Sequence, residues 1–170
     1  MPFTPLHLGP ALLLGLVFTR HLDTLTLLVA SVVVDIEPFM VLVLGFNRVA
    51  GFRLPVHGFL HSFLGGSIVA LLTGVAMLKT VGLMEPLADS LAMERNLGRG
   101  TVIFSAFTGV YLHILLDSTL YSDIAPFWPL AVNPLLGKTL AGINAYNFCF
   151  ITGLAGLALY LRRFLSTRQG

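Results

Sequence analysis

The chain has 170 residues, of which 56% are hydrophobic and 11% are charged, and its mean hydropathy is +0.88. Soluble domains carry about 25% charged residues, so this composition excludes an ordinary soluble globular protein. A net charge of +2 is too small for a nucleic-acid-binding surface, and the single cysteine, Cys149, excludes an internal disulfide or a multi-cysteine zinc site. The sequence predicts a single integral membrane domain over residues 1–170, with no nucleic-acid partner.

Five apolar runs follow one another along the chain, and a bilayer requires about 20 helical residues per crossing. The first run, 6–18, is too short and is expected to form a short N-terminal helix that packs into the bundle. The other four are long enough to span, namely 25–46, 57–78, 101–120 and 140–161. We therefore predict an all-α, polytopic membrane bundle of four spanning helices plus the short N-terminal helix.

Proline marks the irregular parts of this bundle. Pro38 follows Asp35 and Glu37 inside the run 25–46, and because proline cannot donate to a helical ladder we expect this helix to be broken there. Residues 79–100 alternate charged and apolar side chains, which is typical of a short interfacial helix. Residues 121–138 contain three prolines and are expected to form no regular helix.

The distribution of cations predicts the orientation of the chain. If all five runs cross, three Lys or Arg residues lie on the side of the N-terminus (Arg48, Arg53 and Lys138) and seven on the other (Arg20, Lys79, Arg95, Arg99, Arg162, Arg163 and Arg168). Cytoplasmic loops are enriched in Lys and Arg. We expect a multi-pass protein of the cell membrane with a cytoplasmic C-terminus.

Ionisable side chains interrupt the apolar runs, and most of them fall toward the non-cytoplasmic side. His57 and His61 are four residues apart, as are His113 and Asp117, so each pair is expected on one helical face. Imidazoles and carboxylates are ligands for zinc, manganese and iron(II). The pattern predicts a shared metal site whose ligands come from His7, Asp35, His61, His113 and Asp117.

Each of these features also has a structural interpretation. A histidine pair at a helix end is often interfacial, His113 and Asp117 can form a structural hydrogen bond, and Asp35 and Glu37 can cap a broken helix. His21 and Asp23 are expected in a solvated loop on the opposite side. We favour a functional site because ionisable residues within a membrane are costly to keep there.

Four segments resemble the YdjM-like family of inner-membrane-associated, predicted metal-dependent hydrolases, one member of which is linked to LexA binding. They are "TPLHLGPALLLG", "VDIEP", "HGFLHSFLGG" and "HILLDSTLYSDIAPFWPL", which cover residues 4 to about 136. The resemblance implies a metal-dependent hydrolase in which His7, Asp35 with Glu37, His61 with Ser62, and His113 with Asp117 match the motifs. Glu37 stands where the family pattern has Asp, and His57 falls on its Arg position.

The leading functional prediction is a membrane-embedded hydrolase whose divalent ion, zinc first and manganese or iron as alternatives, activates water. Glu37 or His57 is the predicted general base, while Ser62 and Asp123 are expected to support the site. A pocket open toward the outer leaflet favours a lipid or other amphiphilic ester or phosphoester from the surrounding bilayer. An ion or proton transporter and a non-catalytic scaffold remain alternatives, and homo-oligomerisation is left open.

Overall fold

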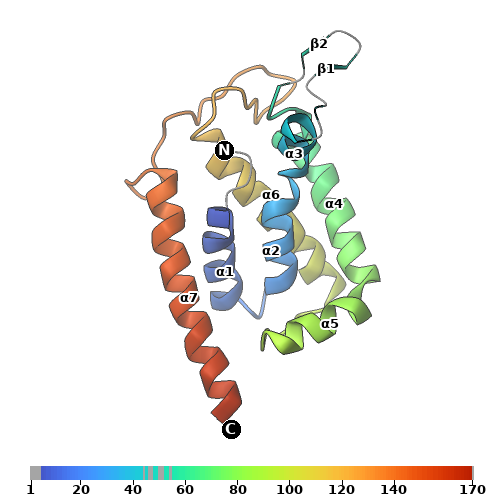
Figure 1. Ribbon diagram of the computed structural model, residues 1–170, viewed down its shortest axis with the longest axis vertical. Coiled ribbons are helices and arrows are strands. Elements are labelled where there is room, and N and C mark those ends of the chain that lie inside the picture. Colours follow the sequence, from blue (N-terminus) through green and yellow to red (C-terminus); the bar gives the residue numbers. More distant parts are fainter. Residues whose placement is uncertain (1–4, 44, 46–47, 50–51, 54, 170) are drawn as a thin grey trace.

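The computed structural model describes residues 5–43, 45, 48–49, 52–53 and 55–169; its longer helices run roughly side by side, and the helix Val81–Ser90 lies across one end of them (Figure 1). In chain order the elements are η1 (Pro5–His7), α1 (Leu8–Val17), α2 (Thr24–Val33), α3 (Ile36–Leu42), β1 (Arg48–Val49), β2 (Phe52–Arg53), η2 (Phe59–His61), α4 (Phe63–Lys79), α5 (Val81–Ser90), α6 (Arg99–Ser118) and α7 (Ala145–Gln169). The two short strands pair antiparallel. Among the described residues, the other regular elements are helical, and residues 119–144 between α6 and α7 form turns and loop, which agrees with the prediction of no regular helix over 121–138.

Three helical segments are long and apolar enough to cross a membrane, namely Thr24–Leu42, Arg99–Ser118 and Ala145–Ser166. The first of them comprises α2 and α3 together. A fourth candidate is the pair α4 and α5, which is bent by 83° between Lys79 and Val81. The described residues thus contain three candidate spans, or four if the bent pair is one, where the sequence predicts four separate ones. The short α1 lies between α2 and α7, as expected for a helix that packs into the bundle (Figure 1).

The predicted break in the second run separates α2 from α3. Pro38 has no N–H for the carbonyl of Val34, and that carbonyl accepts a hydrogen bond from the Glu37 N–H at 3.2 Å instead. This tighter turn interrupts the helix at Val34 and Asp35, about one turn before the proline. The break holds Asp35 at the top of α2, beside the end of α6.

The core lies where α2, α4 and α6 pack together. Its central cluster consists of fully buried apolar residues, namely Ala30, Val34, Ala70, Ala106, Val110 and Ile114. Gly109 allows the close approach of α6 to α2, because a Cβ at this position would lie 2.6 Å from the carbonyl oxygen of Leu27. This packing fixes the height of the Asp35 backbone relative to the last turns of α6.

The third predicted helix begins later than expected. It was predicted from His57, but α4 begins at Phe63, and Ser62 caps it by accepting a hydrogen bond from the Gly65 N–H at 3.0 Å. His57 lies in a bend ahead of η2. The prediction that His57 and His61 project from one helical face is therefore wrong. α7 likewise begins at Ala145 rather than at residue 140.

Candidate metal centre

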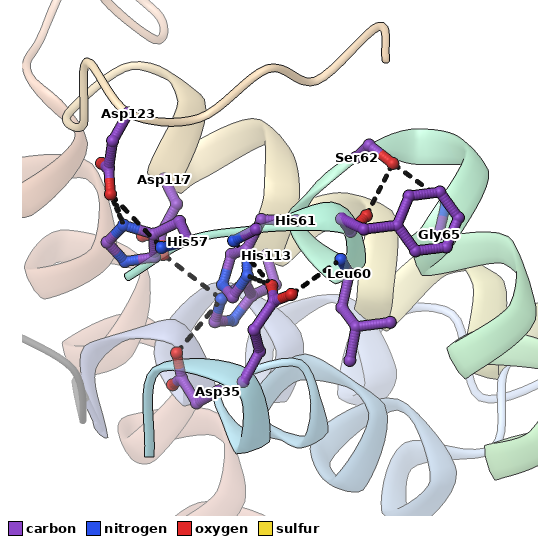
Figure 2. Close-up of polar contacts among 12 residues, drawn as sticks. Asp35, His57, Leu60, His61, Ser62, Gly65, His113, Asp117 and Asp123 are labelled. Carbon is purple, nitrogen blue, oxygen red and sulfur yellow. Dashed lines mark hydrogen bonds and ion pairs between the residues drawn. The ribbon is translucent and has the colours of Figure 1, made fainter. Parts of the chain in front are cut away.

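Four side chains from three different segments meet near one end of the bundle. Asp35 comes from the α2–α3 break, His61 from the end of η2, and His113 and Asp117 from successive turns of α6. Each offers one nitrogen or oxygen atom, and these atoms all lie within 4.8 Å of one another. Figure 2 shows the four side chains pointing toward one another. All four residues are buried, with exposed fractions between 0 and 4%. This group could hold a metal ion.

His61 is oriented by Glu37. Its Nδ1 donates to Glu37 Oε2 at 2.9 Å, which leaves Nε2 buried and without a hydrogen-bond partner among the described residues. Glu37 also accepts hydrogen bonds from the backbone N–H groups of Gly58 (2.9 Å) and Leu60 (3.2 Å). Burial lowers the pKa of His61 below its ordinary value, although the hydrogen bond to Glu37 opposes this effect. The ring is therefore kept neutral, as a metal ligand must be.

His113 is oriented by the backbone of α2. Its Nδ1 donates to the carbonyl oxygen of Ser31 at 2.8 Å. Its Nε2 lies 3.4 Å from Asp35 Oδ1 and 3.3 Å from Asp117 Oδ2, without forming a hydrogen bond to any described residue. Metal-binding histidines commonly donate their other nitrogen to a carboxylate or a carbonyl, so both His61 and His113 have the expected arrangement.

His7 lies against the rim of this group. Its Nε2 is 2.9 Å from Asp117 Oδ1, and its ring centroid is 4.3 Å from that of His113. The sequence grouped His7 with the metal ligands, and the structure places it in contact with one of them. His7 is at the end of η1, where α1 begins, so the N-terminal helix contributes directly to the site.

His57 and Asp123 form a second pair beside the centre. His57 Nδ1 lies 3.1 Å from both carboxylate oxygens of Asp123, and the backbone N–H of His57 donates to the same carboxylate at 3.2 Å. The His57 ring contacts the edge of His61 with centroids 4.8 Å apart and stacks on Tyr121 at 4.5 Å. Because the Asp123 side chain is 40% exposed, this pair links the buried centre to the surface.

Of the two residues predicted to support the site, Asp123 contacts His57, whereas Ser62 has a different role. Ser62 does not contact the candidate ligands through its hydroxyl group, which donates to the Phe59 carbonyl at 2.7 Å and accepts from Gly65. Its preference for the first position of a helix was a signal that could have located the start of α4. The contacts of Tyr121 and of the Ser31 carbonyl were not foreseen, because neither a stacking ring nor a backbone carbonyl is marked by sequence spacing.

A separate polar network lies at the opposite end of α2. Asp23, predicted to be solvated, is fully buried. Its carboxylate accepts from Arg95 Nε at 2.7 Å, from the Asn96 N–H at 3.1 Å and from the Thr26 N–H at 3.0 Å. The last contact caps α2. The expectation of a solvated Asp23 is therefore wrong, because the 91–98 segment folds back over the α1–α2 turn.

Burial of two carboxylates with two imidazoles in an apolar bundle carries a large desolvation cost. A divalent cation would offset this cost, and the donor set of two nitrogens and two carboxylates suits zinc, manganese or iron(II). In comparisons with known proteins, no family model matches the chain, and no curated protein and no solved structure matches it either.

Proposed function

We propose that this protein is a membrane-embedded, metal-dependent hydrolase whose metal ligands are Asp35, His61, His113 and Asp117. The observation that carries the proposal is the meeting of four buried nitrogen and oxygen donors within 4.8 Å of one another. Each histidine forms a hydrogen bond through its Nδ1, His61 with Glu37 and His113 with the Ser31 carbonyl, which fixes the direction of its Nε2. When bound, a dication would lower the pKa of a water molecule and polarise the scissile bond.

The residues around the ligands have distinct roles in this proposal. Glu37 orients His61, since three hydrogen-bond donors engage its two oxygens. His7 orients Asp117. His57, which the sequence offered with Glu37 as a general base, is the better placed of the two, because it contacts His61 on one side and Asp123 on the other. A proton accepted by His57 would be stabilised by the Asp123 carboxylate, which reaches the surface.

The apolar layer below the centre favours an enzyme over a transporter. Val34 and Ile114 are the sequence neighbours of Asp35 and His113, and they belong to a cluster of buried hydrophobic residues. The buried polar residues of α2 and α6 beyond the centre, which include Ser31 and Ser105, carry no charge. A transporter would need polar groups leading from the centre to the opposite face of the membrane. The arrangement therefore fits a pocket that opens toward one side only. A hydrolase is also the activity that the resemblance to the YdjM-like family implies.

Metal-dependent turnover tests this proposal. The full chain, purified in detergent, would be stripped with a chelator, reloaded with zinc, manganese or iron(II), and assayed on a long-chain p-nitrophenyl ester and on a p-nitrophenyl phosphodiester. We expect hydrolysis of one of them only after reloading.

His57→Ala should keep its metal but lose turnover by a factor of about 10²–10⁴, the usual contribution of a general base. His21→Ala, which removes an exposed histidine from the α1–α2 turn, is the matched control. A loaded protein that turns over neither substrate would contradict the hydrolase assignment.

A further inference from the structure

An apolar groove opens beside the candidate metal centre. It has a volume of about 540 Å³ and lies between α3 and the turn that leads into η2. Its lining consists of apolar residues together with Gly58 and a single ionisable residue, Glu37; the apolar ones are Ile36, Met40, Val41, Pro55, Phe59 and Leu60. This volume is within the range of small-molecule sites, which are mostly apolar with a few placed polar groups.

One wall of the groove belongs to a candidate membrane span, and one side chain connects the groove to the centre. Its α3 wall belongs to the candidate span Thr24–Leu42, and Ile36, Met40 and Phe59 are each more than a third exposed. Its polar end is the Glu37 carboxylate, which lies against His61 Nδ1 at 2.9 Å. The width of one imidazole ring therefore separates the end of the groove from the candidate metal ligand His61 Nε2.

Gly58 shapes this polar end. A Cβ at this position would lie 2.6 Å from Glu37 Oε1, so the absence of a side chain here lets the carboxylate lie directly against the Gly58 backbone, whose N–H donates to Glu37 Oε2 at 2.9 Å. The residues that line the groove bring one carboxylate and no Lys or Arg. An anionic end group would meet repulsion from Glu37 at this position, whereas an uncharged polar end, such as an ester with hydroxyl groups, would not.

We propose that the groove binds the alkyl chain of a membrane amphiphile with an uncharged polar end, and that it holds this end beside Glu37, one imidazole ring from the metal-binding atom of His61. The inference rests on the proposed function, because it identifies the substrate class of the same site. The α3 wall of the groove belongs to a candidate membrane span, so the bilayer around it would supply such chains.

Photolabelling tests the proposal. The full chain would be placed in phosphatidylcholine vesicles with a trace of monoacylglycerol carrying a diazirine in mid-chain, irradiated, and mapped by mass spectrometry. We expect labels in the segments 36–41 and 55–60, at about tenfold the level on the exposed face of α4, a ratio that corresponds to 1.4 kcal/mol. Excess unlabelled long-chain monoacylglycerol should remove them, and an alkyl sulfate probe of equal chain length should label the groove less.

Two variants block the groove and one serves as a control. Met40→Trp and Ile36→Trp should each reduce groove labelling about tenfold, whereas Leu71→Trp, on the exposed face of α4, should leave it unchanged. Even labelling of all lipid-facing helices, or labelling that survives both blocking variants, would overturn the inference; equal labelling by the alkyl sulfate would overturn the uncharged end group. The metal content of the same samples separates the two proposals: even labelling with bound metal overturns the groove alone, while groove labelling without metal overturns the hydrolase.

Discussion

Glu37 is the residue on which the geometry of His61 depends. It joins the α3 helix to the turn 58–60 and to the His61 ring through three hydrogen bonds. None of these contacts requires Glu37 to touch a metal. Its contribution to metal binding would therefore come from fixing the tautomer and the direction of His61.

Replacement of Glu37 by glutamine should weaken metal binding without unfolding the protein. The amide retains one acceptor oxygen but loses the charge that polarises His61, so we expect the metal affinity to fall about 10–100-fold. Competition titration with a zinc chelator would measure the change. Glu94→Gln removes an exposed carboxylate elsewhere in the chain and should leave the affinity unaltered. An unchanged affinity in Glu37→Gln would mean that His61 does not bind the ion through Nε2.

At the scale of helices, the site depends on how closely α2 approaches α6. Asp35 follows α2, while His113 and Asp117 are on α6, so the distance between the two helices sets the distance between the ligands. Gly109 occupies the crossing, and a methyl group there would lie 2.6 Å from the Leu27 carbonyl oxygen and 2.7 Å from the Ala30 Cβ.

Gly109→Ala should therefore separate the two helices. We expect a loss of about 1–3 kcal/mol in the free energy of unfolding, the usual range for overpacking, together with weaker metal binding. Thermal unfolding in detergent and zinc titration would measure the two effects. Gly100→Ala, in the first turn of the same helix, is the control, because no described atom beyond its neighbours lies within 4 Å of the added methyl group. Equal stability of the two variants would show that α2 and α6 have room to spare.

The sequence predicted which helices form more accurately than it predicted where they begin. Long apolar runs located α2, α4, α6 and α7, and Pro38 indicated the break that positions Asp35. The predicted start of α4 was too early because the apolar run already begins at His57. The residue that marks the true start is the helix cap Ser62, which a search for apolar runs does not detect. The pairing of His57 with Asp123 joins residues 66 positions apart, and only the fold brings them together.

At the scale of the whole molecule, the two polar networks lie at opposite ends of α2. The β1–β2 hairpin and the end of α6 mark one end of the bundle, while α5 and the C-terminus lie toward the other (Figure 1). The metal-ligand group is near the first end, and Asp23 with Arg95 is near the second. Because the buried apolar cluster lies between them, the two networks should act independently.

Arg95→Ala should therefore reduce stability without changing metal affinity. The Arg95 side chain is 7% exposed and pairs with fully buried Asp23, and removal of one partner of a buried pair costs about 3–5 kcal/mol. Chemical unfolding followed by circular dichroism, with zinc titration of the folded protein, would measure both quantities. Arg99→Ala, at an exposed position, should change neither. A metal affinity that falls in Arg95→Ala but not in Arg99→Ala would show that the two ends are coupled.

His61, Asp35, His113 and Asp117 would together hold one metal ion. Elemental mass spectrometry of the detergent-purified full chain, with wild type beside His61→Ala and His21→Ala, tests this binding most directly. We predict a stoichiometric transition metal in the wild type and in His21→Ala, and its loss from a folded His61→Ala. Absence of metal from all three proteins, even after incubation with zinc, manganese and iron(II), or full retention in His61→Ala, would contradict the account.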